Sequence, residues 1–471
     1  MNDAEFGILA CGTYVPRYRL PGQLVADAHA WFQPSLRSAA KLTRSFANWD
    51  EDALTMAVEA GRHCLADTDV AVDRLSVAST TLPFADRSNA GIVREALDLA
   101  SGIDLSETGG SQRAASSTLS AVLRDAGEHT TLLLASDCYD SQPAATDEAT
   151  TGHAAAGVLI GSGEPLATLR ASVTLNHDFV DHYRSAGEAF NYSLEPRWIR
   201  DAGYREQVQT AWATCLDGAG LESVDHLLIA APGALASPLA KILGRADDGA
   251  VLSRSIGYAG NAHALLLLAD VLGRAQPGET IALLAVGQGI DLLLFDVRQT
   301  AAVPPISDGI AEDNYTRYLA IRRLLNIDEG IRAERDNRTS QSAAWRKHEA
   351  VTAFKGGRCS NCGTVQYPLS RICVECGASD SQTLVPLAGR QGTVRSFTED
   401  WLAYTQRPPL VFGNVGFGDG ANVMMEFTDV TPGQLAVGMP IELRFRIKDF
   451  DDRRGFRRYF WKPTPEGHAN G

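Results

Sequence analysis

Residues 72–78 read VDRLSVA and residues 224–230 read VDHLLIA, so a short apolar strand after a Val-Asp pair occurs twice. The strand segments LLLA at 132–135 and ALLA at 282–285 recur at a similar offset, each after a glycine-containing turn. Solenoid repeats have periods of about 20 to 50 residues. An offset of roughly 150 residues therefore indicates a duplicated domain.

Helical and strand patterns alternate within each half of the repeat. Residues 52–65 carry apolar side chains at helical spacing, and Asp50, Glu51 and Asp52 stand at the start, where they favour the helix dipole. This alternation predicts α/β layers. Short strands are expected at residues 75–79, 131–135, 158–161, 227–231, 281–286 and 292–297.

The repeat also makes a geometric prediction. It pairs Ser111-Gln112-Arg113 with Asn261-Ala262-His263, and each triplet opens an apolar helix, at 114–124 and 264–273 respectively. A pseudo-dyad would bring the two helix N-termini together near the molecular centre. Helix N-termini present free N–H groups and partial positive charge, which suits a developing oxyanion or enolate.

Cysteine spacing predicts a metal site near the C-terminus. Cys359, Cys362, Cys373 and Cys376 form C-x2-C-x10-C-x2-C, a spacing at which four thiolates hold zinc tetrahedrally. Because the protein occupies all four positions, the zinc is expected to be structural. The other four cysteines are scattered, and without an export signal we expect reduced thiols rather than disulfides.

The pattern changes to β strands after residue 389, with strands expected at 392–398, 408–412 and 441–447. Between residues 444 and 462, eight basic residues alternate with six aromatic ones, a composition that can bind a nucleic-acid single strand. Asp449, Asp451 and Asp452 interrupt this basic patch, and the chain carries a net charge of -14. We therefore expect the patch to serve an interdomain contact or a ligand phosphate, and we expect no nucleic-acid partner.

Bulk composition bounds the remaining possibilities. The chain has 471 residues, which suggests two or three domains. No window reaches the roughly 18 apolar residues of a spanning helix, and residues 1–5 (MNDAE) lack the basic start of a signal peptide. We expect a cytoplasmic protein without a membrane partner.

Three segments, in family order, resemble hydroxymethylglutaryl-CoA synthases of the thiolase superfamily. They are GTYVPRYRL at 12–20, DEDALTMAVEA at 50–60 and GQGID at 287–291. The resemblance covers roughly residues 6–298 and implies the duplicated five-layer αβαβα thiolase fold, a homodimer and acyl-CoA thioester substrates. Residues 340–464 resemble the rubredoxin-like zinc-ribbon and OB-fold proteins that accompany thiolase-like enzymes.

The residues that this resemblance would make catalytic are replaced. The positions of the family's basic Glu, nucleophilic Cys and active-site His hold Thr80, Gln112 and Ala230; a one-residue slip would put Ser111 at the Cys position. A Gln cannot act as a nucleophile, and a Ser needs an activating base. Ordinary synthase activity is therefore not expected.

The same resemblance suggests another chemistry. Thiolase-like aldolases that shorten steroid side chains also lack the Cys, cleave 3-hydroxyacyl-CoA thioesters, and act with a separate zinc-ribbon/OB-fold partner. A similar partner is fused here. We predict a carbon–carbon lyase for aldol or retro-aldol chemistry without a covalent acyl-enzyme. The alternatives are an acyltransferase or condensing enzyme that uses Ser111, and a non-catalytic acyl-CoA-binding scaffold.

Candidate site residues follow from this hypothesis. His263 is a candidate base, and Tyr258, roughly at the place of the family's active-site Asn, could orient or deprotonate the hydroxyl. Ser111 and Gln112 could bind the thioester carbonyl, and Arg113 the CoA part. A packed His, a core Tyr and an N-capping Ser are the structural alternatives. Further candidates are Asp181, His182, Tyr183, Arg184, His153 and, as a surrogate nucleophile, Cys138.

The expected domain order follows from these patterns. Residues 1–165 and 166–300 form the two thiolase-like halves. Residues 301–350 form a docking helix, expected at 315–324, and a polar linker at 336–342. Residues 351–388 form the zinc ribbon and residues 389–464 the OB-fold.

Overall fold

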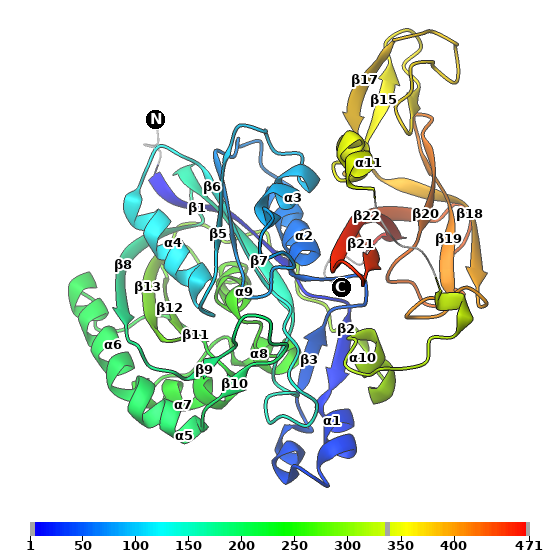
Figure 1. Cartoon of the computed structure of the whole chain (residues 1–471). Helices are drawn as coiled ribbons and strands as arrows, with labels where there is room; N and C mark the ends of the chain where they lie inside the picture. The colour runs from blue at the N-terminus through cyan, green and yellow to red at the C-terminus, as the bar shows by residue number, and fades with distance from the viewer. Residues whose placement is uncertain (1–4, 335–339, 468–471) are drawn as a thin grey trace.

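The structure is a computed structural model that describes residues 5–334 and 340–467 (Figure 1). The body of the molecule, coloured blue to green, lies on one side, and the C-terminal part, yellow to red, lies on the other. Residues 336–339 of the predicted polar linker lie outside the described residues. Within the described ranges, no helix combines the length and the apolar character needed to cross a membrane.

Nine strands of the body form one hydrogen-bonded sheet made of two halves. The strand order is β5-β4-β6-β7-β1 in the first half and β8-β13-β12-β11 in the second, and the pairing of Ile8 with Ala167 joins them. One pair of neighbouring strands in the first half corresponds to one pair in the second. These pairs, β4 with β6 and β11 with β12, are both parallel. The duplication predicted from the sequence is therefore confirmed. The strands are β1 (Glu5–Tyr14), β4 (Arg74–Ala78), β5 (Asp104–Thr108), β6 (Thr131–Asp137), β7 (Ala154–Gly163), β8 (Ala167–Asn176), β11 (His226–Ala230), β12 (Thr280–Val286) and β13 (Gly289–Val297).

Helices form three layers around the two halves of the sheet. Helices α4 and α9 share one apolar core with strands of both halves, so they form the central layer. Helices α2 and α3 cover the outer face of the first half, and α6 and α7 cover that of the second. The result is the predicted αβαβα order. The helices are α2 (Ala53–Leu65), α3 (Asn89–Ala96), α4 (Ala114–Asp125), α6 (Arg205–Ala219), α7 (Gly233–Leu243) and α9 (Asn261–Leu272).

The N-termini of the two central helices meet, as the repeat predicts. The amide of Ala115 donates to Oδ1 of Asn261 at 3.0 Å, and Nδ2 of Asn261 donates to the carbonyl of Ser111 at 3.2 Å. Helix α9 begins at Asn261, three residues before the predicted start, because this side chain ties its first turn to α4.

Shorter elements cover the lower edge of the body. They are β2 (Tyr18–Pro21), α1 (Gly22–His29), η1 (Pro34–Ala39), β3 (Thr43–Phe46), β9 (His182–Tyr183), β10 (Tyr192–Ser193), α5 (Pro196–Trp198), η2 (Ile199–Tyr204), α8 (Ala250–Ile256) and β14 (Ile310–Ala311). After β14 the chain leaves the body through α10 (Tyr315–Ile321), which ends earlier than the predicted helix, and continues through η3 (Ile331–Ala333), α11 (Gln341–Arg346) and α12 (His348–Val351).

The C-terminal part contains two small sheets. One has three strands, in the order β16-β15-β17, and carries the four paired cysteines; the other has five antiparallel strands, in the order β20-β19-β18-β21-β22. The strands are β15 (Lys355–Cys359), β16 (Val365–Gln366), β17 (Gln382–Pro386), β18 (Gly392–Asp400), β19 (Leu410–Phe417), β20 (Asn422–Glu426), β21 (Pro440–Asp451) and β22 (Phe456–Pro465).

Ion pairs hold this five-stranded sheet against the start of α2. Nζ of Lys462 lies 2.9 Å from the Asp50 carboxylate, and Arg446 lies 3.1 Å from Glu51; all four side chains are almost fully buried. Asp50 and Glu51 therefore bind the C-terminal part, which corrects the prediction that they act on the helix dipole. Only Asp52 caps α2, in a capping box with Thr55.

Part of the basic patch of the C-terminal strands lies in this interface. Arg444 pairs with Glu59 at 3.0 Å, and Arg457 pairs with Asp52 at 2.6 Å. Arg444 is buried and Arg457 is neutralised by Asp52 although 30% of it stays exposed, so neither adds free positive charge to the surface that the nucleic-acid alternative needs.

Candidate functional site

A cavity of about 470 Å³ lies where the body meets the C-terminal part. Its floor comes from the segments that follow β4 and β6, its roof from the segment after β9 and from residues after α10, and its far wall from β21 and β22. The polar side chains that line it are Glu51, Asp52, Thr80, Thr81, Tyr139, Asp140, Arg184, Arg322, Arg323 and Arg457, and Cys138 joins them.

Asp137, at the end of β6, organises the floor of this cavity. Its Oδ1 accepts from the amide of Thr80 at 2.7 Å and from the hydroxyl of Ser79 at 3.0 Å, and its Oδ2 accepts from the amide of Asn261 at 2.7 Å. Burial raises the pKa of this carboxyl, although these hydrogen bonds oppose the shift. A Cβ on Gly260 would lie 2.3 Å from Oδ2, so glycine is required there.

Tyr139 connects the cavity to the start of α4. Its phenol lies near the side chains of Gln112 and Thr151, and burial raises its pKa well above the usual value. Gln112 is itself buried and does not line the cavity. The predicted carbonyl-binding role of Gln112 stays a prediction.

Cys138 lies in a polar cluster at one side of the cavity. Its Sγ is 3.6 Å from Nδ1 of His153 and accepts from Arg322 at 3.3 Å. However, Nδ1 of His153 already accepts from the amide of Ala47 at 2.9 Å. Burial raises the pKa of the Cys138 thiol to about 12 and lowers the pKa of His153 to about 3. Both groups are therefore neutral near pH 7.

Arg322 brings the segment after α10 into the body. It contacts the Asp140 carboxylate from Nε at 3.1 Å and from Nη2 at 2.8 Å, and it donates to the carbonyl of Ala47 at 3.0 Å. Although burial alone would raise it, this guanidinium keeps the pKa of Asp140 below its usual value, so the carboxylate is ionised.

Arg184 reaches the cavity from the opposite side. Its Nη2 donates to the carbonyl of Thr80, and its Nε is buried without a hydrogen-bond partner. It forms no ion pair with a carboxylate in the described part of the chain. An arginine in this state can bind an anionic oxygen of a ligand.

Ser111 and Arg113 face away from the cavity, toward the last glycine-rich turn. The hydroxyl of Ser111 donates to the carbonyl of Gly287 at 2.9 Å. The Arg113 guanidinium donates to Asp291 at 2.9 Å, to Gly287 at 3.1 Å and also to Asn176. Both side chains join α4 to β13, and their predicted roles toward substrate stay predictions.

His263 and Tyr258 pack against each other behind the floor. Their rings are 5.0 Å apart, edge to face, and Nε2 of His263 is 3.0 Å from the hydroxyl of Ser253. Burial lowers the pKa of His263 to about 4. The Tyr258 phenol is close enough to Tyr139 and Asp137 for their charges to raise its pKa further, beyond the effect of burial. Neither residue lines the cavity.

The other sequence candidates occupy a neighbouring network. Asp181 accepts from the Tyr204 hydroxyl at 2.5 Å and lies 2.8 Å from His182. Tyr183 is half exposed in β9. Tyr139 and Asp140 line the cavity but were not predicted as site residues from the sequence. Their signal was the polar run Asp137 to Asp140 that follows a buried strand at the same sheet edge as Thr80.

The four paired cysteines form a metal centre. Their Sγ atoms all lie within 4.8 Å of one another, with Cys359 to Cys376 at 3.8 Å and Cys362 to Cys373 at 3.6 Å. A tetrahedral ZnS4 site with Zn–S bonds of about 2.3 Å has sulfur separations of about 3.8 Å. The donor set fits a structural zinc ion, and no position is left open for catalysis.

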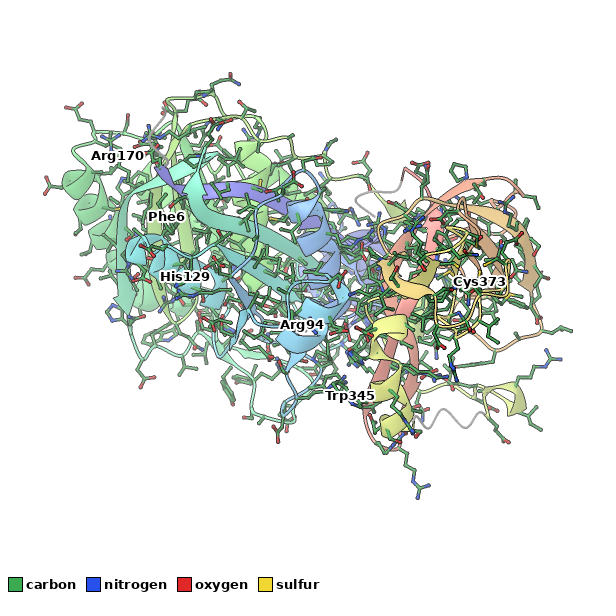
Figure 2. The ribbon with its side chains drawn as sticks, turned by 90° about the horizontal axis from the view of Figure 1, so that it is seen from above. Phe6, Arg94, His129, Arg170, Trp345 and Cys373 are labelled. Carbon is green, nitrogen blue, oxygen red and sulfur yellow. The ribbon has the colours of Figure 1, made fainter. Side chains whose placement is uncertain are left out.

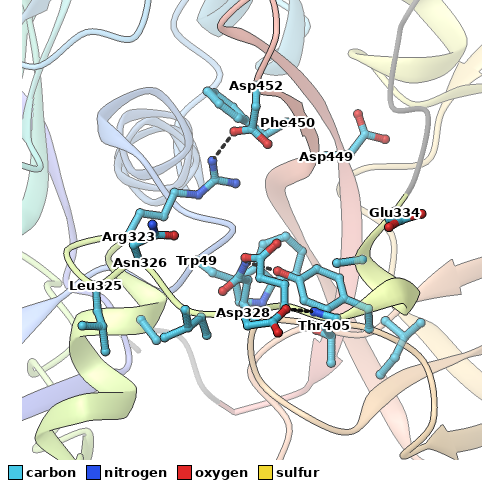
Figure 3. Close-up of a pocket in the computed structure, with 18 of the residues that line it drawn as sticks. Trp49, Arg323, Leu325, Asn326, Asp328, Glu334, Thr405, Asp449, Phe450 and Asp452 are labelled. Atoms are coloured by element: carbon cyan, nitrogen blue, oxygen red, sulfur yellow. Dashed lines mark hydrogen bonds and ion pairs between the residues drawn. The ribbon is translucent and has the colours of Figure 1, made fainter.

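A larger, open groove of about 1090 Å³ adjoins the cavity and shares Trp49, Arg323 and Phe450 with it (Figure 3). The close-up shows Arg323 directed at Asp452, an ion pair of 2.8 Å. Carboxylates predominate along this acidic groove, so it disfavours an anionic ligand. They are Asp328, Glu329, Glu334, Glu426, Asp449 and Asp452.

Comparisons with known proteins agree with this architecture. The model of the rubredoxin-like zinc ribbon domain of ChsH2 matches residues 349–381, and that of its C-terminal OB-fold domain matches residues 384–446. A hydroxymethylglutaryl-CoA synthase of Aeropyrum pernix is 27% identical over 352 residues, which are 70% of this chain and 94% of the synthase. The corresponding synthase of Pyrobaculum aerophilum is 25% identical over 353 residues, 69% of this chain and all of the synthase.

A solved structure shows the same fold. MvaS in complex with 3-hydroxy-3-methylglutaryl coenzyme A superimposes with a TM-score of 0.54 at 19% identity, covering 64% of this chain and 85% of MvaS. The chain thus combines a hydroxymethylglutaryl-CoA synthase-like body of thiolase fold with ChsH2-type zinc ribbon and OB-fold domains. This confirms the predicted fold class and the predicted fusion.

Proposed function

We propose that the protein cleaves, or in reverse forms, the C2–C3 bond of a 3-hydroxyacyl-CoA by aldol chemistry without a covalent acyl-enzyme. Similarity to hydroxymethylglutaryl-CoA synthases supports an acyl-CoA thioester as the substrate. The observation that carries the aldol proposal is Gln112 itself, which is buried just before α4 at the position where the resemblance expects a nucleophilic cysteine. An amide at this position can bind a carbonyl but cannot hold an acyl group.

The cavity and its surroundings support a non-covalent route. Ser111 donates its proton to the carbonyl of Gly287, and no described histidine or carboxylate accepts from it. Cys138 is a neutral thiol, and the nearby imidazole nitrogen is engaged by Ala47. Nucleophilic catalysis needs a base or a depressed pKa to activate such groups, and neither is found here.

The groups that line the cavity suit a retro-aldol step. Of the three carboxylates there, that of Asp140 is the most exposed, at 12% against 5% for Asp52 and none for Glu51. We assign Asp140 as acceptor of the 3-hydroxyl proton. The C2–C3 bond then breaks, C3 leaves as a ketone or aldehyde, and the electron pair passes to a thioester enolate, which takes the proton back from Asp140 at C2.

Arg184 is assigned to the enolate oxygen. Its buried Nε lacks a partner, and a fixed donor aimed at developing negative charge stabilises a transition state more than a ground state. Tyr258, which packs edge to face on His263 behind the floor, keeps its proposed place in proton transfer. His263 keeps the same proposed role and is tested separately.

A homodimer is part of the proposal. Among the described residues strand β5 pairs with β4 alone, so its outer side is an open sheet edge, and Asp104, Leu105 and Glu107 are exposed. An unpaired edge strand invites pairing with another chain. Light scattering should give a mass near twice the 50.5 kDa of one chain.

Mass spectrometry of a thioester panel tests the reaction. Secondary and tertiary 3-hydroxyacyl-CoAs, aromatic and steroidal ones included, are incubated with the purified protein, and small molecules and intact protein are weighed from the same tubes. We expect a shortened acyl-CoA, a ketone or aldehyde, and unmodified protein. A stable acyl adduct would favour the acyltransferase alternative, and bound but unchanged thioesters would favour the scaffold.

A further inference from the structure

The acidic groove of about 1090 Å³ (Figure 3) lies on the face with which OB-folds bind ligands. That face consists of the second and third strands, the loop between strands one and two, and the loop between strands four and five. The residues that this sheet contributes to the groove occupy these places: Leu410 in β19, Glu426 in β20, residues 404–406 before β19, and Asp452 between β21 and β22. The position of the groove therefore indicates a ligand-binding surface.

The opposite side of the groove is the segment that follows α10, residues 323–334. Nε2 of Gln406 donates to Glu329 at 3.2 Å, and Nη1 of Arg332 donates to the carbonyl of Leu402 at 2.7 Å. Both bonds hold the segment against the loop before β19. The connection between the body and the C-terminal part is thus itself one side of the groove.

Two aromatic rings stand where the groove meets the cavity. The side chains that line both are Trp49, Arg323, Leu324 and Phe450. Nζ of Lys462 lies 4.2 Å from the centre of the Trp49 ring. The guanidinium groups of Arg323 and Arg457 lie 4.5 Å and 5.7 Å from the centre of the Phe450 ring. These cation–π contacts hold both rings in place, so a ligand that spans the cavity and the groove passes fixed apolar surfaces.

Negative charge predominates in the groove because both cationic side chains that line it are neutralised. Arg323 pairs with Asp452 at 2.8 Å, and Lys448 pairs with Glu426 at 2.5 Å. Three further carboxylates of the groove form no ion pair with any residue that the structure describes; they are Asp328, Glu329 and Glu334. Apolar side chains of the same segment also line the groove, namely Leu325, Ile327 and Ile331. The groove thus combines an apolar lining with uncompensated negative charge.

This charge decides which end of an acyl-CoA the groove can accept. The phosphates of coenzyme A are anionic, so the carboxylates of the groove repel them. The acyl chain lacks that charge, and the cavity assigned to the reacting carbons adjoins the groove at Trp49 and Phe450. The substituent at C3 can therefore extend past these two rings into the groove.

We infer that the acidic groove receives the far end of the C3 substituent and selects substrates by charge. The substrate class is a 3-hydroxyacyl-CoA with an extended apolar chain that ends in a neutral or cationic group. A chain that ends in a carboxylate is rejected, because its end lies beside Asp328, Glu329 and Glu334. This inference rests on the proposed use of acyl-CoA thioesters, but it concerns binding and does not depend on the aldol step.

Calorimetry with acyl-CoAs that lack the 3-hydroxyl tests the groove without turnover, because such thioesters cannot undergo retro-aldol cleavage. The probes are decanoyl-CoA and its ω-amino and ω-carboxyl derivatives. At low ionic strength we expect the ω-carboxyl derivative to bind about tenfold more weakly than decanoyl-CoA, and the ω-amino derivative to bind at least as tightly. The difference should shrink at high salt, since salt screens exposed charges.

Neutral substitutions locate the effect. Asp328→Asn combined with Glu329→Gln should bring the affinities for the neutral and ω-carboxyl probes to within about threefold of each other. The matched control, Asp217→Asn with Glu222→Gln, removes two exposed carboxylates near the end of α6 and should keep the full difference. Figure 2 shows Arg170, which donates a hydrogen bond to this end of α6, on the side of the body opposite the C-terminal part.

A larger ring at the junction tests the path of the chain. Phe450→Trp narrows the passage between cavity and groove, so it should weaken binding of decanoyl-CoA more than binding of acetyl-CoA. Equal effects on the two thioesters would show that the chain does not pass between these rings.

The outcomes separate charge selection from the proposed reaction. Equal wild-type affinities for the neutral and ω-carboxyl probes would overturn the inference, as would a difference that persists in the groove variant or disappears in the control. If the probes bind in the expected order while the thioester panel gives no cleavage, only the aldol proposal fails. Failure of every acyl-CoA to bind would refute both.

Discussion

The amide of Ala47 donates a hydrogen bond of 2.9 Å to Nδ1 of His153, the ring nitrogen that also lies 3.6 Å from Sγ of Cys138. This bond uses the lone pair that a thiol would need for activation. A cysteine and a histidine at this distance therefore do not form a catalytic pair here. What resembles a nucleophile and its base is a packed cluster that supports the cavity wall.

Replacement of Cys138 should confirm this. Because burial raises the pKa of the thiol to about 12, Cys138→Ala should keep turnover within about threefold of wild type. Iodoacetamide at pH 8 should label Cys138 slowly in the folded protein. Rapid labelling, together with a loss of activity greater than a hundredfold in the variant, would instead identify a covalent mechanism.

Substitutions around the cavity test the proposed acid–base groups. Asp140→Asn and Arg184→Ala should each lower kcat on a cleaved thioester about a hundredfold or more, as expected for loss of a proton acceptor or an oxyanion donor. Arg184→Lys, which keeps the charge, should recover part of the loss. His263→Ala and Tyr258→Phe belong in the same series, because unchanged turnover in both would remove the bases expected from the sequence.

The buried ion pairs between body and C-terminal part should be sensitive to loss of one partner. Lys462→Met leaves the Asp50 carboxylate buried without its cation, which should destabilise the protein by about 3–5 kcal/mol in urea unfolding. A matched control is Arg371→Met in the exposed pair with Asp380, where both side chains are mostly in solvent. That change should cost little, because solvent screens an exposed pair; similar losses in both would contradict the assignment.

Two buried glutamates at this interface should respond to pH in opposite ways. Burial raises the pKa of Glu51 to about 7 although Arg446 opposes the shift, so below pH 7 this pair is only partly ionised, whereas the unfolded chain releases the proton near pH 4.5. Its contribution to stability therefore falls as pH rises from about 4.5 to 7. Glu51→Gln should remove this slope in unfolding free energies measured at pH 5, 6 and 7.

Glu59 provides the opposite case. Burial alone would raise its pKa, but Arg62, Arg444 and Arg446 lower it to about 2. The stability that Glu59 contributes is present above pH 4.5 and is lost as pH falls toward 2. Glu59→Gln should therefore be most destabilising at neutral pH and approach wild type in acid. The reverse order for the two glutamates would show that their charge states are misassigned.

Zinc content tests the four-cysteine centre. Cys373→Ser should lower bound zinc well below one equivalent and destabilise the C-terminal part, because structural zinc sites contribute folding energy directly. Cys138→Ser is the control and should retain one equivalent. Zinc loss with an undisturbed C-terminal part would contradict a structural role.

The sequence predicted those parts of the molecule that depend on periodic or local patterns. The repeat at residues 72–78 and 224–230 identified the corresponding strands β4 and β11, and the spacing from Cys359 to Cys376 identified the metal centre. Helix N-termini were expected to meet, and Asn261 joins them. These features could be predicted because each is encoded within a short segment.

The functional cavity could not be predicted in the same way, because separate segments build it. Arg322 follows α10 and Arg457 lies in β22, and only docking of the C-terminal part places both beside Asp140. The acidic run Asp50–Asp52 gave no local sign of its distant partners, Lys462 and Arg446. Charge alternation in β21 and β22 indicated a binding surface correctly, but the bound surface is the protein's own body.

One chain runs from β13 through α10 to β22 and joins the body to the C-terminal part. This covalent link lowers the binding free energy that their interface must supply. Two separate proteins would have to offset about 4–15 kcal/mol of lost translational and rotational freedom before docking. A tether replaces that requirement with an effective concentration that can reach the millimolar range. The contact can therefore consist of buried ion pairs, which favour one orientation over others more than they add affinity. Each thiolase-like body is thus made together with one C-terminal part, which forms one wall of its cavity.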